Sequence, residues 1–325
     1  MKKNWVKPMI IDKIAINENN HKIHEYYYNS AREGMFDLFS NMLVEGLVNT
    51  LFMPGYIGWS PKEGSGIFDP IDKIEGISIE YYKMTSDLTI DFKDLLHRIQ
   101  KLNNGKFAVL VVNYFGFVDP YIKDIVDIIR QYSGWIITDN AHGFFTYQYT
   151  VDNYSDATFF SLHKMFPFKC GGSLILKNKQ LIDYKYRGSK ISDTQYNPWK
   201  YDVRNIARIR LENYVILEAI IVKENNAEYL TPLKTNIMEG NIPQTFPIRI
   251  NKGNRDRIYE LMNQAGYGVV SLYHTLIEPL RCSEYQASLN LSKSIMNLPV
   301  HQDADKDKYQ DMVNLLVRHC RLTSK

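Results

Sequence analysis

Residues 107–138 read FAVLVVNYFGFVDPYIKDIVDIIRQYSGWIIT, and this stretch decides the fold class. It begins with an apolar run, Phe107–Asn113, of the kind that forms a strand buried on both faces. Apolar residues then recur at helical spacing over Ile122–Tyr132, and a second short apolar run follows at Trp135–Thr138. A strand, a helix and a strand in this order predict a layered α/β domain with a mostly parallel sheet.

The same alternation extends over residues 30–180. Further strands are expected at Thr50–Met53, Gly76–Glu80, Ala157–Leu162 and Ser173–Leu176, with helices at Met35–Glu45 and Phe92–Lys101. A long helix without Gly or Pro follows at Arg204–Asn225. We assign all of this to a large domain, residues 1–240.

The pattern changes after Asn241. Three strands are expected at Gln244–Ile250, Val269–Leu272 and Met296–Val300, with helices at Arg255–Gln264 and Lys306–Arg318. Pro299 makes the last strand an edge strand, because proline has no N–H to donate to a neighbour. Residues 241–325 are therefore predicted to form a smaller α+β domain.

Composition excludes several classes of protein. The chain has 325 residues, 45% of them hydrophobic, which is an ordinary globular balance. Its net charge of +3 gives no electrostatic reason to expect a nucleic acid or an anionic membrane as partner. The three scattered cysteines and eight histidines show no disulfide framework and no metal-ligand spacing. With no apolar run long enough for a signal peptide or a bilayer span, we expect a cytoplasmic protein without a metal.

Polar residues with chemical potential follow two of the predicted strands. Asp139 ends one strand and His142 comes three residues later; Ser161 and Lys164 stand at the end of another. On its own, Asp139 is better explained as a helix cap, and Lys164 and Lys169 are also explained as ordinary loop lysines. A lysine beside a buried strand also suits Schiff-base chemistry, for which burial and neighbouring cations expose a nucleophilic amine.

Together these segments supply what pyridoxal phosphate (PLP) requires. Its aldehyde needs a lysine, and its pyridine nitrogen needs a carboxylate. Its phosphate needs hydroxyl and N–H groups, preferably at a helix N-terminus. Lys164 meets the first need and Asp139 the second. Ser161 and the predicted helix start at Ser30-Ala31-Arg32 meet the third.

The order of these motifs, closed by Gly171-Gly172, resembles the fold type I PLP enzymes. Within them it is most similar to the DegT/DnrJ/EryC1/StrS group of sugar aminotransferases. Asn49–Tyr56, Val112–Pro120 and Met296–His301 resemble further motifs of that group, so the resemblance spans roughly residues 28–320. It implies an aspartate-aminotransferase-like large domain followed by a smaller one.

The resemblance also implies a reaction and partners. The expected activity moves an amino group from an amino acid to a keto sugar for polysaccharide or surface-glycan biosynthesis, and this sugar is expected to be nucleotide-linked. The expected assembly is a homodimer. On sequence alone, the aromatic segment Tyr196–Tyr201 fits an interface and packing on its own domain about equally well, and the resemblance favours the interface. The alternatives are another PLP-dependent sugar enzyme, such as a dehydratase, or a catalytically silent relative. Lys164 argues against the dehydratase branch, in which histidine replaces the lysine.

Roles for individual residues follow from the same resemblance. Lys164 would bond to the cofactor and move protons, and Asp139 would pair with the pyridine nitrogen. His142 would lie against the ring or its 3′-oxygen. The phosphate would be bound by Ser161, Ser30, Ala31 and Arg32, and the ring face would be covered by Tyr56 or Trp59.

The choice between Lys164 and Lys169 generates a prediction. Lys164 precedes Gly171 by seven residues, as the lysine does in the group that the chain resembles. We expect Lys164→Ala to abolish the borohydride-reducible bond between protein and cofactor, and Lys169→Ala to retain it. Peptide mass spectrometry after reduction makes the measurement. Cofactor found on Lys169 would refute the assignment.

Overall fold

The computed structural model describes residues 24–62, 64–102, 105–150, 152–189, 196–223, 227–235 and 237–324. The start of the chain, where we expect no signal peptide, lies outside these ranges, as do the last two residues expected in the long helix. Within the described ranges, no helix is long and apolar enough to cross a membrane.

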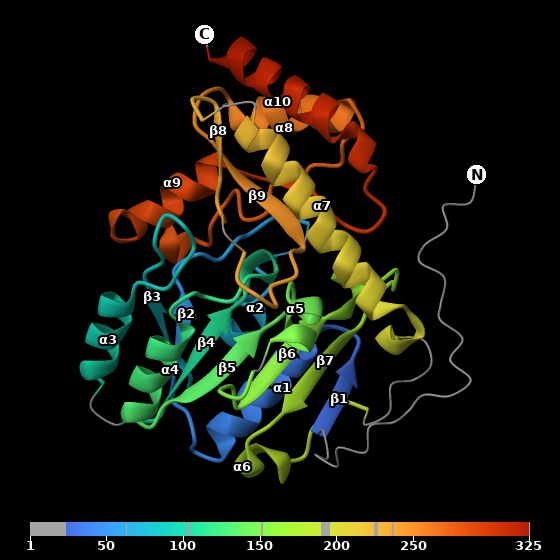
Figure 1. The fold of residues 1–325 in the computed structure, drawn as a ribbon. Helices are drawn as coiled ribbons and strands as arrows, with labels where there is room; N and C mark the ends of the chain where they lie inside the picture. The colour runs from blue at the N-terminus through green and yellow to red at the C-terminus, as the bar shows by residue number, and fades with distance from the viewer. Residues whose placement is uncertain are drawn as a thin grey trace.

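A seven-stranded sheet forms the larger part of the molecule (Figure 1). Its strands are β1 (His24–Tyr28), β2 (Thr50–Pro54), β3 (Ser78–Tyr82), β4 (Phe107–Val112), β5 (Trp135–Asp139), β6 (Ala157–Ser161) and β7 (Gly172–Leu176). The order is β1-β7-β6-β5-β4-β2-β3. Strands β6, β5, β4, β2 and β3 run parallel, whereas β7 and β1 are antiparallel to their neighbours. The expected mostly parallel α/β sheet is confirmed, and β1 is an addition to it.

Helices cover both faces of this sheet, with α1 on one face and α3 and α4 on the other (Figure 1). The helices are α1 (Ala31–Val44), α2 (Asp69–Asp72), α3 (Phe92–Gln100), α4 (Ile122–Gln131), α5 (Phe144–Tyr149), α6 (Lys179–Ile182) and α7 (Val203–Lys223). Helix α4 buries Ile125, Ile128 and Ile129, the apolar stripe that its sequence predicts. Coverage of both faces explains why the central strands are apolar without alternation.

A smaller antiparallel sheet lies above the carboxyl ends of the larger one, in the order β10-β9-β8 (Figure 1). It comprises β8 (Leu230–Pro232), β9 (Thr245–Ile250) and β10 (Ile295–Pro299), with helices α8 (Arg255–Gln264), α9 (Gln286–Ser294) and α10 (Tyr309–Thr323). Pro299 ends an edge strand, as expected. Strand β8 precedes the boundary expected at residue 241, and the exact division into domains stays a prediction.

The strand expected at Val269–Leu272 is wrong. Within it only Val270 pairs with another strand, through a bridge to Asn297. The backbone turns sharply just beyond, because Tyr273 has a left-handed φ of 62°. The apolar run therefore leads into a turn instead of extending the sheet.

Backbone pairing joins this turn to the larger sheet. The Trp59 N–H donates to the Thr275 carbonyl at 2.8 Å, and the Ile277 N–H donates to the Ile57 carbonyl at 3.0 Å. Gly58 permits the approach, since a Cβ there would stand 2.5 Å from the Tyr273 ring. The two loops thus close over the carboxyl ends of the parallel strands.

Candidate active site

The candidate site lies where the parallel strands end. In the register of the sheet, Asp139 at the end of β5 is opposite Val112 of β4 and Phe159 of β6. Ser161, the last residue of β6, lies two residues beyond Phe159 at the same edge of the sheet. Open α/β sheets bind their ligands at this edge. A cavity of about 560 Å³ occupies it.

Both parts of the chain contribute to the cavity wall. Its polar lining residues include Ser30, Arg32, Ser60, Lys62, Ser65, Asp139, His142, Ser161, His163, Lys164, Ser271, Tyr273 and His274. Among the described lining residues, Asp139 is the single carboxylate, whereas Arg32, Lys62 and Lys164 are basic. The cavity therefore suits an anionic ligand that carries one cationic or protonated group.

Lys164 is presented to the cavity by a short 3₁₀ turn, Leu162–Lys164. Its neighbours Leu162, Met165 and Phe166 are almost completely buried in an aromatic cluster. The Phe166 ring packs edge-on against Phe144 at 5.0 Å. This apolar anchoring orients the lysine, whose Nζ lies 3.0 Å from His142 Nε2. Lys169 does not line the cavity.

Asp139 is 4% exposed, and its Oδ1 accepts a hydrogen bond of 2.7 Å from the Ala141 N–H. Burial raises the pKa of the carboxyl group, while the Ala141 hydrogen bond and the charge of Lys164 oppose that rise. The next helix, α5, begins only after Gly143 at its N-cap. The structure thus excludes the helix-cap interpretation and places the carboxylate in the cavity wall.

His142 contributes a planar imidazole ring to the site and is 4% exposed. Its ring stacks on Phe115 with centroids 5.9 Å apart and planes 12° apart. Its Nδ1 accepts a hydrogen bond of 3.3 Å from the Phe115 N–H. Burial first, and the charge of Lys164 second, lower the pKa of His142 well below its usual value, so the imidazole is neutral near pH 7.

The N-terminus of α1 forms an anion-binding corner. Ser30 caps the helix by accepting a hydrogen bond of 3.3 Å from the Glu33 N–H. As in any helix, the N–H groups of the first turn have no acceptor within the helix itself. Gly172 lets β7 approach, because a Cβ there would stand 2.2 Å from the Ala31 nitrogen. The expected residues Ser30, Ala31 and Arg32 all line the cavity.

Ser161 completes this corner together with a residue that sequence reasoning missed. The Ser161 hydroxyl lies 3.4 Å from His163 Nδ1, and both side chains line the cavity. His163 follows Ser161 at a spacing of two residues and directly precedes Lys164. That position was the available signal.

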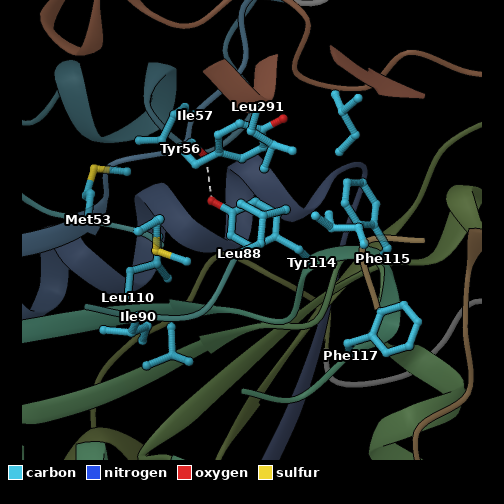
Figure 2. Packing of buried hydrophobic residues seen from close by; sticks show 14 of the residues in the cluster. Met53, Tyr56, Ile57, Leu88, Ile90, Leu110, Tyr114, Phe115, Phe117 and Leu291 are labelled. Atoms are coloured by element: carbon cyan, nitrogen blue, oxygen red, sulfur yellow. Dashed lines mark hydrogen bonds between the residues drawn. The ribbon is translucent and has the colours of Figure 1, made fainter. Parts of the chain in front are cut away.

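Of the two residues expected to stack on the cofactor ring, the structure places one in the cavity and the other in the core. Trp59 lines the cavity and is 42% exposed. Tyr56 does not line it: the side chain is fully buried, with its ring 5.6 Å from Tyr114 and 5.4 Å from Tyr273. Figure 2 shows Tyr56 and Tyr114 packed together in the core. The interpretation of Tyr56 as a cofactor contact is therefore corrected, and Tyr273 and His274 are cavity residues that sequence reasoning missed.

These residues fit PLP group by group. A primary amine, Lys164, faces a buried carboxylate, Asp139, across one cavity. A flat neutral imidazole, His142, lies between them in the wall. At one end the α1 N-terminus, Ser161 and His163 offer hydroxyl, N–H and imidazole donors for a phosphate. Among the described lining residues, no other charged group is unfavourable for PLP in this position.

Comparison with known proteins places this site in a class. The family model for class-V aminotransferases matches residues 61–224, about half of the chain. Comparison with curated protein sequences finds no match. The fold, by contrast, matches many solved structures.

Three of these structures illustrate the likeness. PseC of Helicobacter pylori, an aminotransferase of pseudoaminic acid biosynthesis, has a TM-score of 0.69 at 15% identity, over 92% of this chain and 87% of that one. A DegT DnrJ EryC1 StrS aminotransferase from Brucella abortus gives 0.67 at 13%, over 93% and 86%. The sugar aminotransferase CalS13 from Micromonospora echinospora gives 0.67 at 14%, over 91% and 87%.

The fold and the site together define a PLP-dependent enzyme of fold type I. The chain belongs to the class-V aminotransferase family and is a PLP-dependent aminotransferase. The expected resemblance to the DegT/DnrJ/EryC1/StrS group is confirmed at the level of the fold.

The placement of Asp139 generates a prediction. We expect Asp139→Asn to fold and bind PLP but to lose activity by about a hundredfold or more, the loss typical of removing a preorganised charge. A neutral amide does not hold the proton on the pyridine nitrogen. Asp119→Asn is the matched control, since Asp119 is also a buried carboxylate but lies outside the cavity. Equal activity of the two variants would exclude this role for Asp139.

Proposed function

We propose that the protein transfers an amino group from an amino acid to a keto sugar, and that this sugar is linked to a nucleotide. The observation that carries the proposal is the cavity rim. Beyond the residues that fit PLP, the rim presents Trp59, Lys62 and His274. A glycan-building pathway is the expected setting, as for the fold relative PseC, which acts in pseudoaminic acid biosynthesis.

The rim suits a nucleotide better than a bare sugar. A neutral sugar has no use for the Lys62 ammonium, whereas a diphosphate bridge pairs with it. The Trp59 indole, 42% exposed, offers an aromatic face on which a nucleobase stacks. These groups come from two loops at the cavity entrance. The uncharged sugar would point inward, so the nucleotide would lie among these groups.

The residues of the chain have distinct tasks in this proposal. When bound, PLP supplies an aldehyde that takes up the amino group and a ring that withdraws electrons. Lys164 Nζ binds the cofactor and moves a proton to and from the reacting carbon. Asp139 holds the proton on the pyridine nitrogen, and His142 covers the ring. Ser30, Ser161 and His163 hold the phosphate, which fixes the ring over Asp139.

Two half-reactions test the proposal. The PLP form is mixed with each amino acid, and amine formation on the cofactor is followed by absorbance. The aminated form is then mixed with nucleotide-linked keto sugars and with the same sugars lacking the nucleotide. We expect the nucleotide-linked sugars to react, and Lys62→Ala to raise their KM about tenfold, the loss of one charge-assisted hydrogen bond.

Lys169→Ala is the control, because Lys169 lies outside the cavity and should leave both half-reactions unchanged. The amino-acid half-reaction of Lys62→Ala should also be unchanged. Preference for free keto acids over every keto sugar would contradict the proposal. Loss of a hydroxyl group from a keto sugar without amination would favour the dehydratase alternative. A protein that binds no PLP would favour the catalytically silent relative.

We further propose a cytoplasmic homodimer whose interface includes Tyr196–Tyr201. Trp199 is 49% exposed although its ring packs 5.9 Å from Phe144. Tyr201 and Tyr196 contact Phe168, at 5.8 and 5.9 Å. This patch is continuous with the aromatic cluster that anchors Lys164. A partner covering the patch would bury exposed aromatic surface directly beside the active site. The free cysteines are consistent with a reducing compartment.

The assembly is tested by light scattering at micromolar concentration. We expect twice the mass of the 38.0 kDa chain and a shift toward monomer in Trp199→Asp, because the charge would be buried at the interface. Tyr121→Asp is the control, since Tyr121 is an exposed aromatic residue at the N-cap of α4. A wild-type monomer with full activity, or equal dissociation of both variants, would refute this interface.

A further inference from the structure

Phe115 has a backbone conformation that needs an explanation. It lies in a 3₁₀ turn, Tyr114–Gly116, that follows β4, and its φ and ψ are 57° and 17°. This left-handed conformation is unfavourable for a non-glycine residue, because its Cβ comes too close to the following carbonyl oxygen. Such residues persist where the surrounding structure holds them, and they concentrate at functional sites. Here the turn contacts a residue of the active site.

Packing holds the turn against His142. Gly116, with φ of 90°, has no room for a side chain: a Cβ would stand 2.6 Å from the Ile242 carbonyl and 3.1 Å from the His142 carbonyl. The Thr146 hydroxyl donates to the Gly116 carbonyl at 2.6 Å. Phe115 itself is completely buried (Figure 2). The turn is thus clamped between β4, α5 and the segment that leads to β9.

The strained conformation directs two groups of Phe115 at one imidazole. Its N–H donates to His142 Nδ1 at 3.3 Å, and its ring stacks on the His142 ring at 12°. A nitrogen that accepts an N–H hydrogen bond carries a lone pair and no proton. The proton of a neutral His142 therefore resides on Nε2, the atom that lies 3.0 Å from Lys164 Nζ.

We propose that Phe115 is a positioning residue that holds His142 as its Nε2–H tautomer, with this hydrogen directed at Lys164 in the cofactor-free enzyme. The burial that lowers the pKa of His142 agrees with a neutral ring. The significance for catalysis rests on the proposed role of Lys164 in proton transfer, whereas the tautomer does not.

The consequence concerns the form of the lysine. An ammonium group has donors only, so a hydrogen bond from Nε2–H is accepted by Lys164 only as the neutral amine. The neutral amine is the form that attacks an aldehyde carbon and that accepts a proton from a substrate carbon. The Phe115 N–H thereby favours the neutral amine of Lys164 through two hydrogen bonds, one to His142 Nδ1 and one from His142 Nε2.

Other groups that face this pair compete with that arrangement. Asp139 favours a positive charge on Lys164. His163 precedes the lysine on the same turn, Arg32 faces the cavity from α1, and the Tyr273 ring lies 6.1 Å from the His142 ring. If Asp139 prevailed, an ammonium would donate to Nε2, and the proton on Nδ1 would then oppose the Phe115 N–H.

Nitrogen-15 NMR of histidine-labelled, cofactor-free enzyme tests the tautomer directly. The eight histidines are resolved by subtracting the spectrum of His142→Gln. We expect Nε2 of His142 to be protonated and Nδ1 to be unprotonated throughout about pH 6 to 8, the range in which an ordinary histidine titrates. A proton on Nδ1, or titration within this range, would overturn the proposal.

Three variants separate the contributions of Phe115. Phe115→Gly removes the restraint and the ring, so we expect mixed tautomers of His142. We also expect the uptake of PLP, trapped by borohydride at fixed times, to slow about tenfold. This is the effect usual for an outer partner that orients a histidine. Phe115→Leu keeps the buried N–H and the apolar volume, so it should keep the Nε2–H tautomer. Phe117→Leu is the control, because Phe117 packs on Tyr214 away from the cavity and should leave both readouts unchanged.

The outcomes distinguish this inference from the proposed function. A single wild-type-like tautomer in Phe115→Gly would refute the positioning role even if the enzyme aminates sugars. Failure of every sugar substrate, with the tautomer as expected, would refute only the proposed function. If the glycine variant does not fold, loss of the Nε2–H tautomer in Phe115→Leu would refute control by the backbone N–H.

Discussion

The alignment of parallel strands is the constraint on which the rest of this molecule depends. Parallel neighbours end at the same edge, so any polar residue that ends one strand lies beside the residues that end the next. Asp139 and Ser161 line one cavity for this reason, although 22 positions separate them in the chain. The antiparallel return of β7 then brings Gly172 against the start of α1. A carboxylate, a lysine turn and a helix N-terminus thus converge without any of them being adjacent in sequence.

Apolar packing supplies the rigidity that this convergence needs. Asp139 and His142 are nearly inaccessible, which costs free energy unless other groups compensate. The Ala141 N–H does so for Asp139, and the Phe115 N–H does so for His142. The aromatic cluster around Phe144 and Phe166 holds the lysine turn in place. The same cluster reaches the exposed Trp199, so a partner subunit there would stiffen the turn further.

The entrance of the cavity differs in character from its floor. The floor is built from strand ends and helix starts of the larger sheet, which the hydrogen-bond ladder holds firmly. The entrance consists of two loops joined by two backbone hydrogen bonds near Gly58. Trp59 and Lys62 come from one loop, and Tyr273 and His274 from the other. Cofactor chemistry would therefore reside on the rigid part, and substrate choice on loops that tolerate variation.

Local patterns sufficed for much of this structure. The continuous apolar runs that became β4, β5 and β6, and the stripe of isoleucines that became α4, predicted the α/β sheet because burial on both faces leaves a readable signature. The same patterns placed Asp139, Ser161 and Lys164 at strand ends. What they left undecided depends on contacts between distant segments. Tyr56 was expected in the cavity, but packing with Tyr114 and Tyr273 encloses it in the core. Tyr273 and the left-handed Phe115 gained their places from turns whose partners lie far along the chain. Sequence alone identified candidates for the chemistry, such as Asp139 and Lys164, because residue type and local periodicity are local properties. Tertiary structure decided which residues meet in the cavity, because a side chain's neighbours and a backbone's strain are set by the packing of the whole fold.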